Sequence, residues 1–218
     1  MKAHTLSDLL KAGDRVAVSN VTGREACQVT EATQRYCGNI CAGWALGKGG
    51  QEVKAEQGQN IPVFADFRTL MHALPDGQKP NKVIVYSPPE AVYGEVKGVC
   101  EHGKGRIETI FIITEHVAVE VTAKIHRTCA EAGIDVVGCN TLGVINVHDR
   151  VRVGVVGGLH PEEAFSPGSV TIVSNSGNMV NTIASYLHTA GMGTSFGCST
   201  GKDVLLLTPP VDFVRLAI

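Results

Sequence analysis

The sequence predicts an α/β fold built on a doubly wound parallel sheet. Short apolar segments rich in β-branched residues alternate with amphipathic helical segments along most of the 218-residue chain. The apolar segments end abruptly in small or polar residues, and the 25 glycines suit the many tight turns that join strands to helices. Such alternation is typical of a parallel, Rossmann-like sheet with helices on both faces.

The first part of the chain supplies most of these units. After a short helix at 6–10, we expect strands at 15–20, 40–44, 61–65, 82–86, 109–113 and 134–138. Helices are expected at 24–36, 67–72, after 89, and at 117–132. Pro88 and Pro89 fit the first turn of the helix after 89, where a missing N–H costs little. Gly133 ends the helix at 117–132.

The alternation lapses between about 144 and 167, where glycines and charged residues indicate connecting segments. We therefore expect a first domain at 1–150 and a second at 165–218. The second has a strand at 169–173, a helix at 177–190, a strand near 194–198 and a few closing helical residues. These units are too few for a domain of the usual size, so the second domain is expected to be incomplete.

Composition limits the classes of function. With 44% hydrophobic and 18% charged residues, the chain is expected to fold around a substantial core. A net charge of −2 gives no electrostatic reason to expect nucleic acid or an anionic membrane as partner. No apolar run approaches the roughly 20 residues of a membrane span, and the first residues lack a signal-peptide pattern. The seven scattered cysteines favour reduced core residues of a cytoplasmic protein, and no metal site is expected.

The segment 170–180 predicts an anion site. An apolar strand ends at Ser174 and runs through a Ser/Gly turn into a helix, so unpaired backbone N–H groups and the positive end of the helix dipole point to one place. That place suits a phosphate or a carboxylate. The expected site residues are Ser174, Asn175, Ser176, Gly177 and Asn178. The same pattern also fits an ordinary corner between a strand and a helix.

A second candidate site lies at the strand ends of the first domain, because ligands of open parallel sheets bind beyond the carboxyl ends of the strands. A nicotinamide cofactor is disfavoured, because the first turn lacks G-x-G-x-x-G and no acidic residue stands between Glu31 and Glu52. Lys48, flanked by glycines, stands there instead and, with Arg24, suits the phosphates of coenzyme A. Alternatively, Lys48 is a solvated loop lysine.

Taken in order, these motifs resemble those of the succinyl-CoA synthetase α-subunit family. The resemblance runs from about residue 14 to 200 and rests on 22–25, 47–50, 87–89, 113–115, 138–146 and 174–177. It implies a CoA-binding Rossmann-like domain followed by part of a flavodoxin-like ligase domain. It also implies CoA contacts from Thr22, Gly23, Arg24, Glu25, Lys48, Ser87, Pro88, Pro89, Ile113, Thr114 and Glu115.

One detail resembles the ATP-citrate lyase and citryl-CoA synthetase branch. The loop Ser-Asn-Ser-Gly-Asn-Met-Val-Asn ends in Asn181, where succinyl-CoA synthetases tend to have tyrosine. Asn181 lies one helical turn beyond Gly177, so its amide could face the same anion and donate to a tricarboxylate. Two departures leave another acid substrate open. Asn175 replaces the usual arginine, and the segment 197–203 follows the family's Gly-Gly-Asp-Pro loop only loosely.

The resemblance implies an ADP-forming acid–CoA ligase that works through a phosphohistidine and an acyl phosphate. An ATP-grasp β subunit would supply the sites for ATP and Mg²⁺, and a small carboxylic acid would be the substrate. None of the eight histidines has the family's Gly-His-Ala-Gly context, so no catalytic residue is assigned and the chain alone is expected to be inactive. Two alternatives stay open: a non-catalytic module that binds CoA or a nucleotide, and an NAD-binding redox-sensing domain.

Overall fold

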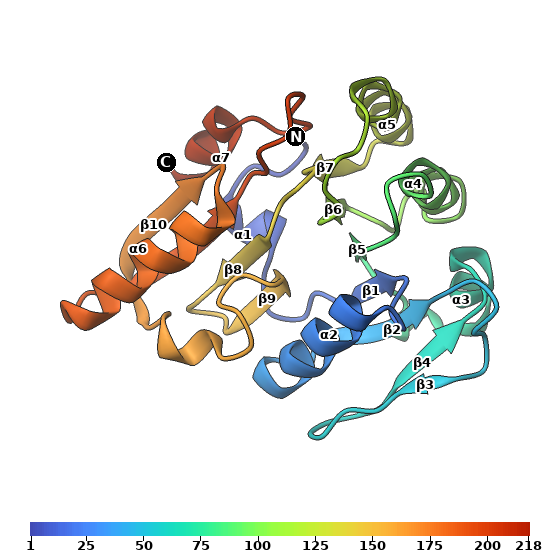
Figure 1. Ribbon diagram of the computed structural model, residues 1–218, viewed down its shortest axis with the longest axis horizontal. Helices are drawn as coiled ribbons and strands as arrows, with labels where there is room; N and C mark the ends of the chain where they lie inside the picture. The colour runs from blue at the N-terminus through green and yellow to red at the C-terminus, as the bar shows by residue number, and fades with distance from the viewer.

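A computed structural model describes residues 1–218 and arranges their strands in two sheets (Figure 1). The strands of the larger sheet are β1 (Val16–Ser19), β2 (Ile40–Trp44), β3 (Glu52–Val53), β4 (Ile61–Phe64), β5 (Lys82–Val85), β6 (Thr109–Ile112) and β7 (Asp135–Val137). Their order is β3-β4-β2-β1-β5-β6-β7, and all pairs are parallel except β3–β4. The order reverses at β1, so this sheet has the predicted doubly wound, Rossmann-like topology.

The helices follow the predicted pattern with one correction. They are α1 (Leu6–Leu9), α2 (Arg24–Tyr36), α3 (Phe67–Ala73), α4 (Val92–His102), α5 (Val119–Ala132), α6 (Gly177–Thr189) and α7 (Pro210–Ala217). Gly133 ends α5 in the left-handed conformation (φ 68°), as predicted. Pro88 and Pro89, however, are not in the first turn of α4, which begins only at Val92. They lie in a turn closed by the Ala91 N–H, which donates to the Pro88 carbonyl.

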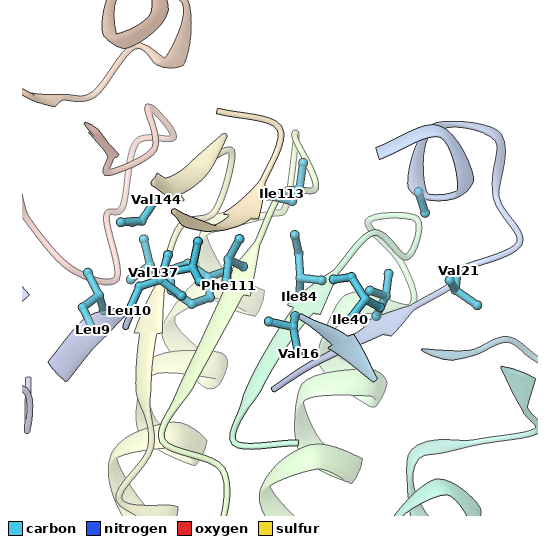
Figure 2. Close-up of a cluster of buried hydrophobic side chains, with 14 of the residues drawn as sticks. Leu9, Leu10, Val16, Val21, Ile40, Ile84, Phe111, Ile113, Val137 and Val144 are labelled. Atoms are coloured by element: carbon cyan, nitrogen blue, oxygen red, sulfur yellow. The ribbon is translucent and has the colours of Figure 1, made fainter. Parts of the chain in front are cut away.

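Two apolar clusters cover the two faces of the larger sheet, because successive side chains of a strand point to opposite faces. Ala17 packs with α3, α4 and α5 on one face. Val16 and Val18 pack on the other face with α1 and α2, and with Val144 and Val153 of the second sheet. Figure 2 shows Val144 beside Val137 and Phe111 in this second cluster. The two sheets thus share one core.

The smaller sheet has four strands in the order β10-β11-β8-β9. They are β8 (Gly143–Asn146), β9 (Val151–Gly154), β10 (Pro167–Ser174) and β11 (Thr194–Ser199). The β10–β11 pair is parallel, whereas β8 pairs antiparallel with both β11 and β9. The edge strand β10 carries no charged residue and is partly exposed along most of its length. No helix combines the length and apolar character that a membrane crossing needs.

The β8–β9 hairpin corrects the prediction of connectors between 144 and 167. Gly143 and Gly154 face each other across the hairpin with φ of 92° and 89°. A Cβ atom on Gly143 would lie 1.9 Å from the Val153 carbonyl oxygen, so the two backbones come close only because both residues lack a side chain. These glycines therefore occur within a paired structure. The last strand of the larger sheet ends at Val137, and the first strand of the smaller sheet begins at Gly143. The domains at 1–150 and 165–218 remain a prediction.

Candidate functional site

Hydrogen bonds of hydroxyl groups link three strand ends of the larger sheet. Ser19, at the end of β1, lies with its Oγ 3.2 Å from the Oγ of Ser87, which follows β5. The Thr114 hydroxyl, beyond β6, donates a 2.7 Å hydrogen bond to the Ser87 carbonyl. Ser19 and Ser87 are both buried. These contacts fix the ends of β1, β5 and β6 at the reversal point of the strand order, where ligands of such sheets bind.

The first turn of α2 opens at the same edge. Gly23 is the N-cap residue, and no side chain accepts a hydrogen bond from the N–H groups of this turn. A Cβ atom on Gly23 would lie 2.9 Å from the Asn20 side-chain nitrogen, which itself donates to the Tyr86 carbonyl. Arg24 is exposed beside this turn. The available N–H groups, the helix dipole and one arginine together suit a phosphate group.

The other predicted residues of this site lie along the same edge. Lys48 is exposed in a turn between β2 and β3, and its side chain makes no hydrogen bond or ion pair within the chain. Gly47 and Gly50 give this turn its two positive φ angles, 70° and 86°. Ile113 is buried, whereas Pro88, Pro89 and Glu115 are exposed and Thr22 is half-buried. The structure therefore brings the predicted set to one edge of the sheet and leaves Lys48 open to solvent.

The second predicted site lies where β10 leads into α6. The Ser174 hydroxyl oxygen accepts a 3.1 Å hydrogen bond from the Ser176 N–H. Ser176 is the N-cap residue of α6, and its side chain makes no capping bond, so the first turn of this 13-residue helix keeps its N–H groups available. Gly177 packs against Leu142, and a Cβ atom there would lie 2.1 Å from the Leu142 Cγ. Asn175 and Asn178 are exposed.

Asn181 has a structural contact that the sequence did not reveal. Its side-chain oxygen accepts a 2.9 Å hydrogen bond from the Gly157 N–H, in the loop after β9. This bond leaves only the amide NH₂ group of Asn181 for a ligand and fixes which way the amide is turned. The two residues are 24 positions apart along the chain, so no local sequence pattern predicts this hydrogen bond.

Hydrogen bonds join the segment 140–142, which follows β7, to the segment 199–203, and the latter is joined to Ser174 of the second site. The Thr141 hydroxyl donates to the Ser199 carbonyl, and the Leu142 N–H donates to the Ser199 hydroxyl over 3.0 Å. Thr200, next along, donates its N–H to the Ser174 carbonyl over 2.9 Å. Asn140 donates to Asp203, whose other carboxylate oxygen is buried without a partner. Both segments belong to motifs noted in the sequence, 138–146 and 197–203, but the sequence did not predict the contacts between them.

The thiol and metal chemistry near these segments is limited. Burial raises the pKa of Cys139 to about 12, so this thiol is protonated near neutral pH and is a poor nucleophile. No group of three or more His, Cys, Asp or Glu side chains gathers closely enough to hold a metal ion. The arrangement can bind anions at two helix N-termini.

The fold defines an α/β protein of the doubly wound class, with two helix N-termini that no side chain caps at its strand ends. No family model matches the chain. The chain is 31% identical over 202 residues to succinate–CoA ligase (ADP-forming) α subunit 2 of Archaeoglobus fulgidus, covering 93% of this chain and 64% of that protein. It is 28% identical over 199 residues to the corresponding α subunit of Methanothermobacter thermautotrophicus, covering 89% and 60%. These matches confirm the resemblance to the succinyl-CoA synthetase α-subunit family.

Solved structures confirm the fold. ATP citrate lyase from Methanothrix soehngenii, in complex with citrate and coenzyme A, matches 95% of this chain and 34% of its own, with a TM-score of 0.77 and 17% identity. A dinucleotide-forming acetyl-coenzyme A synthetase from Ca. Korarchaeum cryptofilum matches 89% and 40%, with a TM-score of 0.67 and 18% identity. The chain spans slightly less than two thirds of the length of the two ligase α subunits.

Proposed function

We propose that this chain is the CoA-binding part of an acid–CoA ligase α subunit. The observation that carries the proposal is the uncapped α2 N-terminus at the reversal point of the larger sheet, beside the linked ends of β1, β5 and β6. Sequence similarity to succinate–CoA ligase α subunits over 93% of the chain supports the same function. Binding of CoA by the solved ATP citrate lyase, which shares the fold, supports it further.

In this proposal each group at the edge has a physical task. The N–H groups of the first α2 turn and the Arg24 side chain would hold the pyrophosphate. Lys48 would meet the 3′-phosphate, because its glycine-flanked turn allows close approach of a ligand. Ser87, Pro88, Pro89 and Ile113 to Glu115 would form the surface along which the rest of the cofactor lies. The hydroxyl links among Ser19, Ser87 and Thr114 keep that surface fixed before the ligand arrives.

Lys48→Ala is expected to weaken CoA binding by about 10- to 100-fold, because it removes a charge-assisted contact worth roughly 1.5–3 kcal/mol. Isothermal titration calorimetry with CoA and with dephospho-CoA measures the effect. The loss should be confined to CoA if Lys48 meets the 3′-phosphate. Lys124→Ala, on the exposed face of α5, is the matched control and should change neither affinity.

The outcomes of this titration separate the alternatives. Equal losses for the two ligands would move Lys48 to the pyrophosphate, and no loss for either would make it a solvated loop lysine. A titration of the wild-type chain with NADH tests the redox-sensing alternative. Binding of NADH without binding of CoA would overturn the proposed function. CoA binding by a chain that never supports acyl-CoA formation with a β subunit would favour the non-catalytic module.

The finer part of the proposal concerns the acid. We propose that the site at Ser174, Asn175, Ser176, Gly177 and Asn178 takes the phosphoryl group, and that citrate reaches one turn further to Asn181. An ATP-grasp β subunit would supply the sites for ATP and Mg²⁺, and a histidine beyond Ile218 would carry the phosphoryl group. The resemblance of the loop to the citrate-using branch and the fixed orientation of the Asn181 amide support this arrangement.

Asn181→Asp is expected to lower citrate affinity by at least about 10-fold while lowering phosphate affinity much less. The aspartate keeps an acceptor for the Gly157 N–H but replaces the donor with a negative charge that repels the larger anion. Asn178→Asp, in the first turn of α6, is the comparison and should weaken both anions. Affinities from ligand-detected NMR titrations decide the question. Unchanged citrate binding in Asn181→Asp would remove the citrate assignment and leave the phosphate site intact.

A further inference from the structure

Two buried thiols face each other between neighbouring helices. Cys100 lies in the last turn of α4 and Cys129 lies in the last turn of α5, and their sulfur atoms are 3.8 Å apart. Cys100 is 5% exposed and Cys129 is 1% exposed. Both belong to the apolar cluster that also contains Val96, Val99 and Ile125. The packing of the two helices therefore holds the thiols in contact.

We propose that Cys100 and Cys129 form an intramolecular disulfide when the protein meets an oxidised small-molecule disulfide such as oxidised glutathione. A disulfide bond is about 2.05 Å long, so the sulfur atoms must approach by less than 2 Å, which small side-chain rotations on facing helices can supply. The proposal is independent of the function proposed above. It concerns a site of covalent modification.

The other five cysteines are placed differently. Cys27 contacts Glu31, Cys37 contacts Thr33 and Asn39, and Cys41 contacts the Val16 carbonyl. The Cys139 sulfur lies 4.0 Å from the Thr122 hydroxyl, and Cys198 is fully buried without a sulfur or oxygen partner. Cys100 and Cys129 are the only two whose sulfur atoms touch. The structure therefore selects one pair out of seven thiols.

The reaction order follows from the surroundings of the two sulfurs. Cys100 is the more exposed of the two, and in the contact between the two thiols either sulfur can donate. The same contact raises the pKa of Cys129. Cys100 thus loses its proton first and attacks one glutathione sulfur, forming a mixed disulfide and releasing one glutathione thiolate. Cys129 then loses its proton and attacks the Cys100 sulfur, releasing the second glutathione thiolate.

In balance, two protein thiols are oxidised, one glutathione disulfide is reduced to two glutathione molecules, and the two thiol protons pass to the released thiolates. The bond would join α4 to α5. α4 follows the end of β5 at Ser87, and α5 follows the end of β6 at Thr114. These two strand ends are already joined by the hydrogen bond from Thr114 to Ser87, and the disulfide would add a covalent link between the helices that follow them. The oxidised protein should melt roughly 5–10 °C higher than the reduced protein, because the cross-link restricts the unfolded chain.

The test is to incubate the reduced wild-type chain with oxidised glutathione and measure intact mass without reductant. The expected product is about 2 Da lighter, has five alkylatable thiols after denaturation, and yields a cross-linked peptide containing Cys100 and Cys129. Seven alkylatable thiols after oxidation, or a bond between any other pair, would overturn the proposal. Because this arm uses the wild-type chain, it does not depend on the folding of a variant.

Three variants then test the order of events. Cys129→Ser should stop at a stable glutathione adduct on Cys100, whereas Cys100→Ser should form no adduct at Cys129. Cys139→Ser, in the neighbouring strand end, is the matched control and should oxidise like the wild type. Equal adduct formation at Cys129 in Cys100→Ser would contradict the assignment of Cys100 as the first thiol to react.

Discussion

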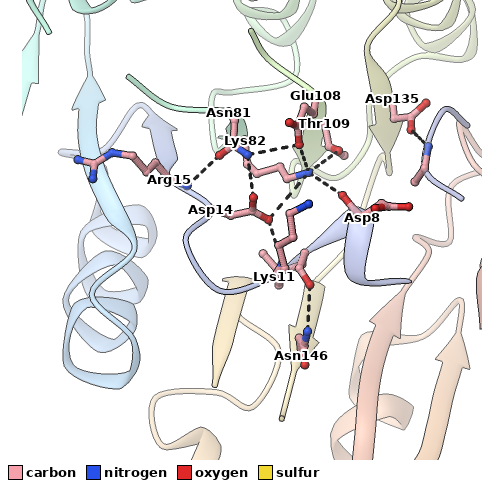
Figure 3. Close-up of polar contacts among 12 residues, drawn as sticks. Asp8, Lys11, Asp14, Arg15, Asn81, Lys82, Glu108, Thr109, Asp135 and Asn146 are labelled. Carbon is pink, nitrogen blue, oxygen red and sulfur yellow. Dashed lines mark hydrogen bonds and ion pairs between the residues drawn. The ribbon is translucent and has the colours of Figure 1, made fainter. Parts of the chain in front are cut away.

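Lys82→Met is expected to lower the free energy of unfolding by about 3–5 kcal/mol, the usual cost of breaking a buried ion pair. Lys82 begins β5, and its side chain is completely buried. Figure 3 shows its amino group directed between Glu108 and Asp14, at distances of 2.9 Å and 4.0 Å. The amino group also donates to the Asp8 carbonyl over 3.0 Å.

The cost arises from the groups that methionine leaves behind. The Asp14 side chain is only 2% exposed, so its carboxylate would lose its cation without gaining water. Two donors would remain for it, the Lys11 N–H and the Asn81 side chain, and neither carries a charge. Glu108 is 55% exposed and would be solvated instead, so most of the effect should come from Asp14.

Urea unfolding of the wild type and of Lys82→Met measures the difference. The matched control is Lys79→Met, because Lys79 pairs with the exposed Asp76 at 2.7 Å, three residues away. Asp76 is 91% exposed and stays solvated without its partner, so the loss of this pair should leave the midpoint almost unchanged. Similar midpoints for Lys82→Met and Lys79→Met would show that Asp14 keeps enough stabilisation from its two uncharged donors.

Gly143→Ala is expected to destabilise the smaller sheet by about 3 kcal/mol or more, because no side chain fits where β8 begins. The new Cβ atom would lie 1.9 Å from the Val153 carbonyl oxygen and 2.8 Å from its carbon, so a backbone must move. The positive φ of 92° adds conformational strain for alanine. The β8–β9 pairing should loosen first.

Hydrogen–deuterium exchange measures this locally, and faster exchange is expected at Val144–Asn146 and Val151–Val153 than in β1 or β5. The control is Gly191→Ala, after α6, where φ is 73° but a Cβ atom meets nothing within 4 Å. It carries the strain of positive φ without the clash and should cost only about 1 kcal/mol. If both variants exchanged alike, conformational strain alone would account for the glycine at 143.

The larger sheet could be predicted from the sequence because the apolar residues within each strand indicate that the strand is buried. A strand covered on both faces is a largely continuous apolar run, as in β5 and β6. In the helix that follows, apolar residues recur at helical spacing, which distinguishes it from the strand. The sequence of the β8–β9 hairpin does not indicate buried strands in this way. Its glycines fit a connector as well as a close approach of two backbones, and only the pairing of Gly143 with Gly154 decides between them.

The candidate sites were predictable to a similar extent. Residues at strand ends could be placed at one edge, since parallel strands end together, and the structure brings Ser87 and Thr114 into contact there. Contacts between distant segments could not be predicted. The hydrogen bond from Gly157 to Asn181 joins residues 24 apart, and that from Asn140 to Asp203 joins residues 63 apart. Such pairs depend on how the two sheets pack, which no local pattern encodes.

The uncharged edge strand β10 has a practical consequence for handling the isolated chain. It is an edge strand of the smaller sheet, and no lysine or glutamate within Pro167–Ser174 opposes pairing with another molecule. Several of its residues are β-branched, which favours extended pairing. Self-association should therefore rise with concentration and fall when Thr171, at the middle of the strand, is replaced by lysine. Light scattering during purification would show whether this strand limits the solubility of the chain.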